Sequence, residues 1–532
     1  MTKGYGNGLL VTRQRGLQAT RRITKLPDVS DVPGHADVVV VGAGNAAMCA
    51  ALAAREHGAD VVVLERAPQG ERGGNSSFTA GAMRVVYESL DDLWALMPDL
   101  TEGELADTDF GTYPASQFFD DMARVTDYRA DADLVEVLVN ESYAALRFLQ
   151  EHGVRFAPAY GRQAFKRDGR FRFWGGLTVE VVGGGPGLVE SEHNAAIAAG
   201  IPIVYDARAT SLVHDEDGVH GAKVRVGGGI TAINAGAVVL ACGGFQADPA
   251  WRAKYLGRDW DLAKVRGTRF NSGDGLRMAF DAGAAPAGHW SGCHAVAWDY
   301  NAPEFGDLRV GDGFQKHSYP LGIVVNRHGR RFLDEGADFR NYTYAKYGRA
   351  ILEQPGQFAW QVFDNKVSGL LRDEYRIREV TKVQADTLET LADRMGDVDV
   401  RGFVDEVERY NAAVLTDVPF DPTILDGRGT TGLAVPKSNW ANVVDEPPLV
   451  AYKVTCGITF TFGGLRITPQ AEVVDHEGTP ILGLFAAGEV VGGLFYNNYP
   501  GGTGLTAGSV FGRRAGAAAA KAAAARQATL AR

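Results

Sequence analysis

The chain contains 532 residues, of which 45% are hydrophobic and 22% are charged, and its formal net charge is −11. This balance is typical of a globular protein that buries a large core without needing disulfides or a structural metal. Because the acidic excess is spread without long runs, we expect neither nucleic acid nor an anionic membrane surface as a partner.

The sequence carries no pattern typical of a metal site, a membrane span or an export signal. Its four cysteines lie at positions 49, 242, 293 and 456 and form no CxxC pair, so we expect no metal and no disulfide scaffold. No apolar run is long enough to span a bilayer. The basic residues Arg21 and Arg22 precede polar sequence, and we therefore expect a cytoplasmic protein.

Residues 36–66 read ADVVVVGAGNAAMCAALAAREHGADVVVLER. The two apolar runs predict buried parallel strands, and the alanine-rich stretch between them predicts a helix. Gly42 permits a tight turn, Gly44 allows the backbone to approach a pyrophosphate, and Glu65 can accept hydrogen bonds from a ribose diol. The pattern predicts a dinucleotide site. The alanine at position 47 and the glutamate at the strand end favour FAD.

The next segment, GERGGNSSFTAGAMR at residues 70–84, favours FAD further. An NAD-binding enzyme of this fold usually continues into another strand and helix, whereas this chain has a second Gly-Gly loop with small hydroxyl residues. Its backbone can reach a flavin ring and phosphates. Taken alone, the same loop is equally consistent with an ordinary surface turn.

Two segments further along the chain fit the same site. The apolar strand at 237–240 ends in small residues that permit close passage of the adenosine half of the cofactor. The stretch NSGDGLRMAFDAGA at 271–284 predicts a turn leading into a helix, with Asp274 between glycines and with Asn271 or Ser272 as the helix cap.

The last part of the chain completes the predicted cofactor site. The stretch GLFAAGEVVGG predicts a strand ending at Glu489, whose carboxylate can bind the ribityl hydroxyls. A C-terminal helix beginning near Gly504 and Leu505 would point its N–H groups at the flavin and stabilise its reduced, anionic form. The predicted cofactor-binding residues are Gly42, Gly44, Asn45, Ala46, Glu65, Arg66, Gly74, Asn75, Ser76, Ala80, Gly81, Ala209, Ala241, Gly243, Asp274, Gly488, Glu489, Gly504 and Leu505.

Taken together, these motifs resemble the FAD-dependent fumarate reductase/succinate dehydrogenase flavoprotein family. The resemblance covers residues 36–518 and rests on VVVVGAGNAA…VLER, GGNSSFTAGAM, VVLACGGF, SGDGLRMA, VVNRHGRRFLDEG, FTFGGL and LFAAGEVVGG. It implies an α/β fold in which a Rossmann-like FAD-binding domain is split by an inserted α+β capping domain. The expected parts are an N-terminal extension (1–35), the first part of the FAD-binding domain (36–286), the cap (287–447) and its second part (448–532).

The resemblance also implies catalytic residues. Family members that handle fumarate place a proton-transferring arginine shortly after an N-x-x-G-x-R-F-x-x-E segment, and Arg340 has that spacing here. A family histidine that holds a substrate carboxylate matches His294. A second family histidine is replaced by Phe460 or Thr459, and a family arginine is replaced by Tyr499. One carboxylate clamp is therefore missing, which disfavours fumarate itself.

The stretches SGCHAVAWD and FYNNYPGGTGL look most like the tricarballylate dehydrogenases of this family, and the Tyr-Pro turn also resembles 3-ketosteroid Δ1-dehydrogenases. Both types remove a hydride and a neighbouring proton from a CH–CH bond. The candidate catalytic residues are Arg340, Tyr499, His294 and Tyr342. Tyr342 and Tyr344 are rivals of Arg340 as the base, and Tyr499, together with the Gly502 or Thr503 backbone N–H, is the candidate hydrogen-bond donor to a substrate oxygen.

Positive charge for a substrate carboxylate is expected from His294, His317 and Lys316.

The sequence therefore predicts an oxidoreductase with non-covalent FAD, because no histidine lies in the Gly-Gly-Asn-Ser-Ser loop where related subunits link their flavin. It would form or reduce an alkene beside a carboxylate or carbonyl of a small organic substrate, as a tricarballylate dehydrogenase does. The alternatives are a ketosteroid or cyclic ketone dehydrogenase, an enoate reductase, and a flavin-carrying electron-transfer subunit. Dehydrogenase and reductase share this geometry, and the sequence identifies no electron acceptor.

Overall fold

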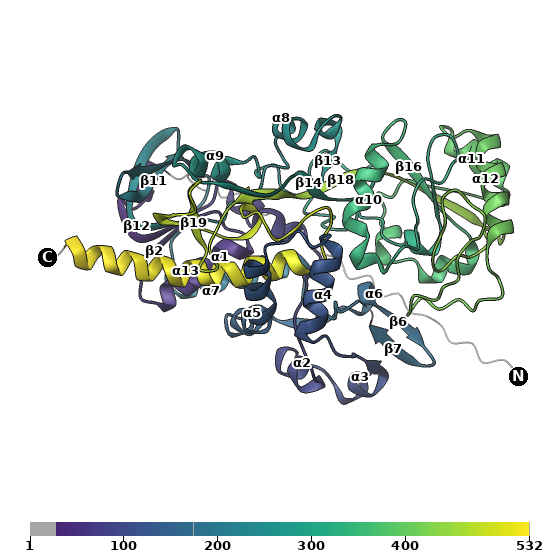
Figure 1. Ribbon diagram of the computed structural model, residues 1–532, viewed down its shortest axis with the longest axis horizontal. Helices are drawn as coiled ribbons and strands as arrows, with labels where there is room; N and C mark the ends of the chain where they lie inside the picture. Colours follow the sequence, from purple (N-terminus) through teal and green to yellow (C-terminus); the bar gives the residue numbers. More distant parts are fainter. Residues whose placement is uncertain (1–27, 174, 531–532) are drawn as a thin grey trace, which may run out of the picture.

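A computed structural model describes residues 28–173 and 175–530 of the chain (Figure 1). Residues 1–27, most of the predicted N-terminal extension, lie outside the described residues. Two bodies lie side by side along the long axis, joined by long strands, with a group of helices below them in the view of Figure 1. Among the described residues, no helix combines the length and the apolar composition needed to cross a membrane.

The first body is built on a mixed sheet whose centre is parallel. β1 pairs in parallel with both β2 and β12, and its residues 38–41 are buried, as expected for a strand covered on both faces. The strand order is β10–β11–β12–β1–β2–β9, and β20 also pairs with β12. The strands are β1 (His35–Val41), β2 (Val61–Leu64), β9 (Ile203–Val204), β10 (Arg208–Asp215), β11 (Gly218–Val226), β12 (Gly229–Leu240), β19 (Glu472–Val474) and β20 (Pro480–Ala486).

The turn after β1 has the predicted form. Gly42 has φ of 108°, and a Cβ there would lie 2.4 Å from the Ala241 carbonyl oxygen, so this position requires glycine. Gly44 is the N-cap of helix α1 (Asn45–Glu56), which packs behind the sheet. The N-terminus of α1 therefore lies at the carboxyl edge of the parallel strands, where ligands bind in open α/β sheets.

The C-terminal helix α13 (Thr503–Leu530) returns to pack directly against α1 (Figure 1). Glycines on α13 make this close approach possible. A Cβ at Gly512 would lie 2.4 Å from the Ala46 carbonyl oxygen, and a Cβ at Gly516 would lie 2.1 Å from that of Ala50. A helix from the N-terminal part of the chain and the C-terminal helix are thus packed together beside the same sheet.

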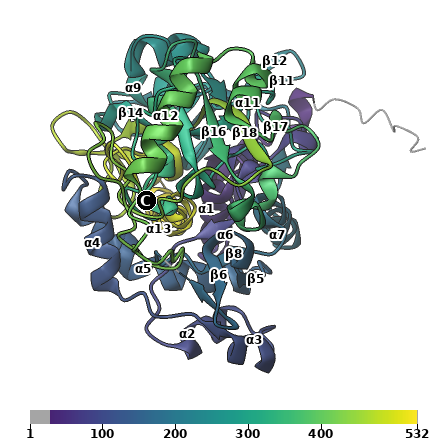
Figure 2. The ribbon, with the colours of Figure 1, turned by 90° about the vertical axis from the view of Figure 1, so that its right-hand side faces the viewer.

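The second body contains the inserted α+β segment. The long strands β14 (Pro286–Asp299) and β18 (Leu449–Leu465) run antiparallel from the first body into the second, where β18 also pairs with β16 and β17. Helices α11 and α12 lie beside this sheet (Figure 2). The remaining strands of the sheet are β13 (Lys264–Val265), β15 (Ile323–Val325), β16 (Phe358–Phe363) and β17 (Lys382–Ala385).

Two small sheets and several helices complete the structure. The small sheets have the orders β3–β8–β5 and β4–β7–β6. Their strands are β3 (Ala82–Met83), β4 (Thr108–Asp109), β5 (Phe156–Pro158), β6 (Ala164–Arg167), β7 (Arg170–Phe173) and β8 (Val179–Val181). The other helices are α2 (Leu90–Leu96), α3 (Glu102–Asp107), α4 (Ala115–Val125), α5 (Ala132–Glu151), α6 (Tyr160–Gln163), α7 (Gly184–Ala198), α8 (Pro249–Trp251), α9 (Asp274–Asp281), α10 (Tyr344–Leu352), α11 (Leu388–Met395) and α12 (Val400–Ala413).

The predicted α/β class with an inserted α+β segment is confirmed, but two local predictions were wrong. Helix α9 is capped by neither Asn271 nor Ser272, because its N-cap is Gly273 with φ of 81° and without a side-chain cap. The Asn271 amide instead donates to Glu489. Strand β20 ends at Ala486, before Glu489, because the chain turns there into a short 3₁₀ helix at Gly488–Val490.

Candidate active site

A cavity runs along the carboxyl edge of the parallel strands and continues towards the second body. Its walls come from both ends of the chain and from the segment between β14 and β18. The predicted cofactor-binding residues line this cavity, with the exception of Gly81. Gly81 supports the neighbouring loop instead, since its carbonyl accepts from the Val181 N–H and a Cβ there would meet Gly184 at 2.9 Å.

The end of the cavity beside α1 has the features of a ribose and phosphate site. Glu65 follows β2 and is almost fully buried, and its carboxylate accepts a 2.7 Å hydrogen bond from the Ala67 N–H. Burial raises the pKa of Glu65 to about 7. The Asn45 N–H donates to Ser76 Oγ at 3.1 Å, which brings the second glycine-rich loop against the start of α1.

Asp274 lines the cavity but is already paired with arginines. Its carboxylate accepts from Arg66 at 2.8 Å and from Arg208 at 2.9 and 2.8 Å. The ion pairs fix the start of α9 beside the end of β2 and the start of β10. Asp274 therefore holds neighbouring segments of the cavity wall together, and the two arginines balance its negative charge.

Glu489 joins three segments around the middle of the cavity. Its carboxylate accepts from the Thr461 N–H at 3.0 Å, from Asn271 at 3.2 Å and from Gln246 at 3.2 Å. Burial raises the pKa of Glu489 to about 7, although these hydrogen bonds favour the charged form. The side chain therefore connects β18, the loop after β12 and the turn before α9.

The cavity wall fits an FAD. At Gly243 a Cβ would lie 2.4 Å from Asn271, and at Gly244 it would lie 2.3 Å from Thr461, so only glycine lets this loop pack so closely against the two side chains. Thr461 Oγ1 is buried without a hydrogen-bond partner among the described residues. The N-termini of α1 and α13 both line the cavity, and the N–H groups of a first helical turn have no partner within the helix, which suits a phosphate and the electron-rich edge of a flavin.

The far end of the cavity contains Arg340, on the 3₁₀ helix η7 (Arg340–Tyr342). One guanidinium nitrogen donates to His317 Nδ1 at 3.1 Å, and another donates to the Arg162 carbonyl at 2.9 Å. Arg340 Nε is buried without a partner among the described residues. Burial lowers the pKa of Arg340. The carboxylate of Glu374 offsets part of this effect, and repulsion from the Arg162 guanidinium adds to it.

Tyr499 faces the same region, as predicted for the Tyr-Pro-Gly-Gly turn. Its hydroxyl forms a short hydrogen bond with that of Tyr344, and the Tyr344 ring lies 6.0 Å from the Arg340 guanidinium. Phe460 and Phe495 pack edge-on against Tyr499, with ring centroids 5.2 and 5.4 Å away. Burial raises the pKa of Tyr499 well above its ordinary value, so the hydroxyl keeps its proton at neutral pH and can donate a hydrogen bond.

The expected positive charge of His294, His317 and Lys316 is not available to a ligand. Burial, together with nearby arginines, lowers the pKa values of both histidines well below their ordinary range, so both rings are neutral. His294 does not line the cavity and packs edge-on against Tyr344 and Tyr499 at 4.9 Å. The Lys316 ammonium is buried beside Asp299 and donates to backbone carbonyls.

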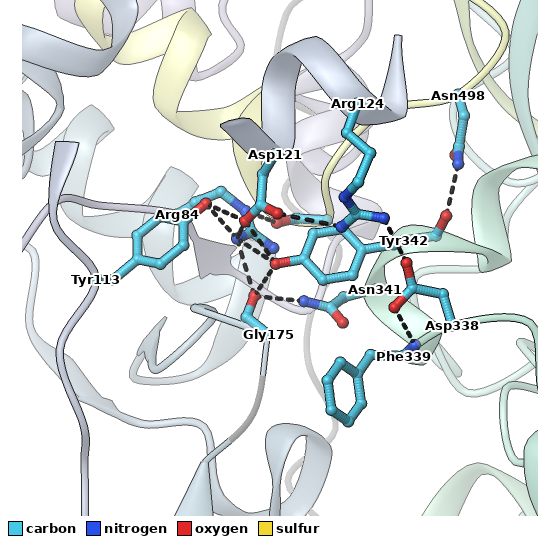
Figure 3. Close-up of polar contacts among 11 residues, drawn as sticks. Arg84, Tyr113, Asp121, Arg124, Gly175, Asp338, Phe339, Asn341, Tyr342 and Asn498 are labelled. Atoms are coloured by element: carbon cyan, nitrogen blue, oxygen red, sulfur yellow. Dashed lines mark hydrogen bonds and ion pairs between the residues drawn. The ribbon is translucent and has the colours of Figure 1, made fainter. Parts of the chain in front are cut away.

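Tyr342 is not brought into the cavity. Its hydroxyl points the other way, donating to Asp121 at 2.7 Å and lying 3.3 Å from Arg84 (Figure 3). Burial also raises its pKa. The side chain is therefore badly placed for a catalytic base, whereas Tyr344 lines the cavity.

A buried ion pair that the sequence did not reveal completes the polar end. Arg266 donates to Asp312 Oδ1 at 2.8 and 2.6 Å, and Arg162 donates to Asp312 Oδ2 at 3.1 Å. These residues lie on segments far apart in the sequence and belong to no recognisable motif. No group of histidine, cysteine or acidic side chains suited to a metal ion occurs among the residues that the structure describes.

Comparisons with known proteins identify the family of this chain. The family described as "FAD binding domain" matches residues 37–505, and the chain belongs to that family. It is 32% identical to the probable fumarate reductase Ifc3 of Shewanella frigidimarina, over 91% of this chain and 74% of that protein. It is 29% identical to 4-oxocyclohexanecarboxylate 2-dehydrogenase of Sinomonas cyclohexanicum, over 87% of this chain and 89% of that enzyme.

Solved structures give the same result for the fold. The open conformation of a flavocytochrome c3 fumarate reductase superimposes with a TM-score of 0.68 and 29% identity, covering 93% of this chain and 80% of that one. A 3-ketosteroid Δ1-dehydrogenase from Sterolibacterium denitrificans shares the fold with a TM-score of 0.71 at 21% identity, covering 92% and 100%. The protein is an FAD-dependent oxidoreductase of the fumarate reductase/succinate dehydrogenase flavoprotein family, which acts on CH–CH bonds.

Proposed function

We propose that the substrate carries a carbonyl group next to the reacting CH–CH bond and an anionic group at its other end, as a cyclic oxo acid does. The observation that carries this proposal is the hydrogen-bonded hydroxyl pair of Tyr499 and Tyr344 in the cavity wall. Burial keeps both phenols protonated, and a neutral hydroxyl can donate a hydrogen bond to a carbonyl oxygen but brings no positive charge to pair with a carboxylate. Arg340 is available for the anionic group or for proton transfer.

In this mechanism FAD, when bound, accepts or donates the hydride. Tyr499 donates a hydrogen bond to the carbonyl oxygen and stabilises the negative charge that develops when the neighbouring carbon loses its proton. Tyr344 holds the Tyr499 hydroxyl in place. Arg340, whose pKa is lowered by burial, accepts that proton in its neutral form when the substrate is oxidised, and in its charged form donates a proton to the substrate carbon when the alkene is reduced. Its hydrogen bond to the neutral His317 holds the guanidinium in place. The aromatic wall of Phe460 and Phe495 excludes water from the reacting carbons.

Tricarballylate is a second candidate, suggested by the motifs around His294 and Tyr499. The charges in the cavity count against it, because Arg266 is paired with Asp312 and the two histidines are neutral. A substrate with three carboxylates would place several negative charges beside one unpaired arginine. We therefore rank an oxo acid first.

We further propose that residues 287–447 act as the cap predicted from the sequence. The connecting strands β14 and β18 enter this segment together, and Arg340 and Tyr344 both come from it. Closing the cap over the first body would bring these residues to a substrate held beside FAD. Non-covalent binding of FAD and a cytoplasmic location remain our expectations from the sequence.

Stopped-flow absorbance with the purified, FAD-loaded protein tests the proposed substrate class. Bleaching of the oxidised flavin band is followed after anaerobic mixing with 4-oxocyclohexanecarboxylate, a 3-ketosteroid, tricarballylate or succinate. We expect the oxo acid to reduce the flavin fastest. Rapid reduction by tricarballylate alone would overturn the ranking. Reduction by none of them, with rapid reduction by a protein electron donor, would favour an electron-transfer subunit.

A further inference from the structure

Arg84 is a fully buried arginine that lies outside the cavity and has no part in the mechanism above. Its guanidinium donates to the carbonyl of Gly501 at 2.9 Å, to that of Gly175 at 2.9 Å and to the Tyr113 hydroxyl at 2.8 Å. Its backbone N–H donates to the Gly502 carbonyl at 3.2 Å. Arg84 therefore binds the turn that follows Tyr499 through both its side chain and its backbone.

Asp121, on helix α4, is the acidic centre of the same cluster (Figure 3). One carboxylate oxygen accepts from the hydroxyls of Tyr113 and Tyr342, both at 2.7 Å, and lies 3.6 Å from Arg84. The other oxygen accepts from Arg124 at 3.1 Å. A buried charge is stable only when it is well paired, so these donors are required together.

The cluster fixes the catalytic segment on both sides of Arg340. Two residues after Arg340, Tyr342 is bonded to Asp121 as described. Two residues before it, Asp338 accepts a 2.5 Å hydrogen bond from Arg124. Figure 3 shows both anchors reaching the same helix α4. Arg340 itself lies in the cavity wall, between two side chains that point out of the cavity.

The same segment is also bonded to the turn that carries Tyr499. The Gly501 N–H donates to the Asn341 carbonyl at 2.7 Å, and the Asn498 side chain donates to the Tyr342 carbonyl at 2.6 Å. Asn341 in turn donates to the Gly175 carbonyl at 2.7 Å. The positions of Arg340 and Tyr499 are thus set by one continuous set of hydrogen bonds.

We propose that Arg84 and Asp121 are positioning residues, which hold the Asp338–Tyr342 segment of the cap against the Tyr499 turn. They thereby fix the position of Arg340 relative to Tyr499 when the cap is closed. This inference rests on the proposed function for its effect on catalysis. The position of the segment itself can be tested without any substrate. Because reacting groups tolerate little misplacement, loosening the segment should slow the chemical step more than it weakens substrate binding.

The first test measures hydrogen exchange in the FAD-loaded protein without substrate. Tyr342→Phe removes one donor to Asp121 and keeps the ring. We expect faster exchange of backbone amides in residues 338–344 and 498–504, with FAD content unchanged. Tyr87→Phe is the matched control, because Tyr87 is a buried tyrosine nearby whose hydroxyl bonds to the Phe110 carbonyl and to Thr178 Oγ1, which belong to neither the 338–344 nor the 498–504 segment. Unchanged exchange in both segments of Tyr342→Phe would overturn the proposal.

The second test measures flavin reduction by the best substrate of the screen. Tyr342→Phe and Asp121→Asn should each lower the reduction rate by roughly 10- to 100-fold while KM changes by less than about 3-fold. Arg124→Gln should have a smaller effect, since that side chain is half exposed. A purely structural role would instead lower the melting temperature and the flavin content together.

A double-mutant comparison separates positioning of Arg340 from other effects. In an Arg340→Lys background, the added Tyr342→Phe change should lower the rate by much less than it does in the wild-type protein, because its effect acts through Arg340. If Tyr342→Phe lowered the reduction rate by the same factor in both backgrounds, that part of the proposal would be overturned. If no substrate reduces the flavin, the proposed function fails, whereas the hydrogen-exchange result still decides whether the cluster holds the segment.

Discussion

At the residue scale, the direction of each tyrosine decides its role. Tyr499 and Tyr344 face the cavity and share a hydrogen bond, whereas Tyr342, two positions away from Tyr344, is committed to Asp121. The three side chains are chemically identical and all have raised pKa values. What separates a carbonyl donor from a structural anchor here is the set of residues that surrounds each hydroxyl.

Tyr499→Phe should lower the rate of flavin reduction by roughly 100- to 1000-fold, the range seen when one donor to a developing oxyanion is removed. The ring still packs against Phe460 and Phe495, so FAD binding and the melting temperature should change little. Tyr344→Phe should cost less, because it only orients the Tyr499 hydroxyl. Single-turnover absorbance measures both rates. A Tyr499→Phe rate within about 3-fold of wild type would remove this residue from the mechanism.

Arg340→Ala should abolish flavin reduction by substrate and leave FAD bound. The guanidinium is the one cavity group in our mechanism that can move the substrate proton, while the cofactor contacts lie elsewhere in the cavity. The measurement is stopped-flow reduction by substrate, with dithionite reduction as the control for intact flavin. Retained turnover of Arg340→Ala would transfer the proton-transfer role to Tyr344.

Residue positions were predictable from the sequence only where a local motif fixed them. Gly42, Glu65 and Gly504 lie where the strand-turn-helix patterns place them, because those contacts form within a few residues. The burial of His294 and the direction of Tyr342 depend on partners such as Phe460 and Asp121 that are more than 150 residues away in the sequence. No local pattern contains that information.

At the scale of elements, the packing of α1 against α13 connects fold and cofactor. The starts of α1 and α13 both line the cavity, so their first turns would supply N–H groups to the phosphates and to the flavin of a bound FAD. Asn45 links the two helices by donating to the Leu505 carbonyl at 2.8 Å. The predicted strands and helices of this region could be derived from apolar runs and glycines, but the contact between the two helices could not.

Gly512→Ala should weaken FAD binding. The new methyl group would lie 2.4 Å from the Ala46 carbonyl oxygen and push α13 away from α1, an overpacking that typically costs about 1–3 kcal/mol. Gly369→Ala is the matched control, because no atom lies within 4 Å of its Cβ position. Fluorescence titration of FAD and thermal unfolding measure the effect. Equal behaviour of the two variants would contradict the role given to this contact.

Helix α7 packs a buried carboxyl against α1 and gives a pH-dependent prediction. Glu192 lies beside Cys49, and burial raises its pKa to about 8. Between about pH 4.5 and pH 8 the native state therefore keeps a proton that the unfolded chain has lost. The free energy of unfolding falls as pH rises through this range, by at most about 5 kcal/mol. This loss of stability, the penalty for charging the buried carboxyl, is complete only above the pKa of Glu192 in the folded protein.

Glu192→Gln should remove that penalty. We expect the variant to be more stable than the wild type by up to about 5 kcal/mol at pH 9 and by only about 1.5 kcal/mol at pH 5.5, because an amide carries no charge at either pH. Denaturant unfolding of the FAD-loaded proteins at the two pH values measures the difference. Parallel pH profiles would show that Glu192 does not titrate in this way.

At the scale of the whole molecule, the site exists because distant parts of one chain meet. The α1 end, the α13 end and the cap segment around Arg340 all line one cavity. The family resemblance predicted this arrangement as a whole, including the split domain. It did not predict the Arg84–Asp121 cluster or the Arg266–Asp312 pair, since each joins segments whose meeting is a consequence of the complete fold.

The most direct test of the central claim is a crystal structure of the FAD-loaded protein with a non-reactive oxo acid bound. We predict one flavin ring between α13 and the cap segment, with the ligand carbonyl oxygen about 3 Å from the Tyr499 hydroxyl and the ligand within reach of the Arg340 guanidinium. A flavin ring elsewhere, or a ligand bound with Tyr499 and Arg340 both remote from it, would contradict the account.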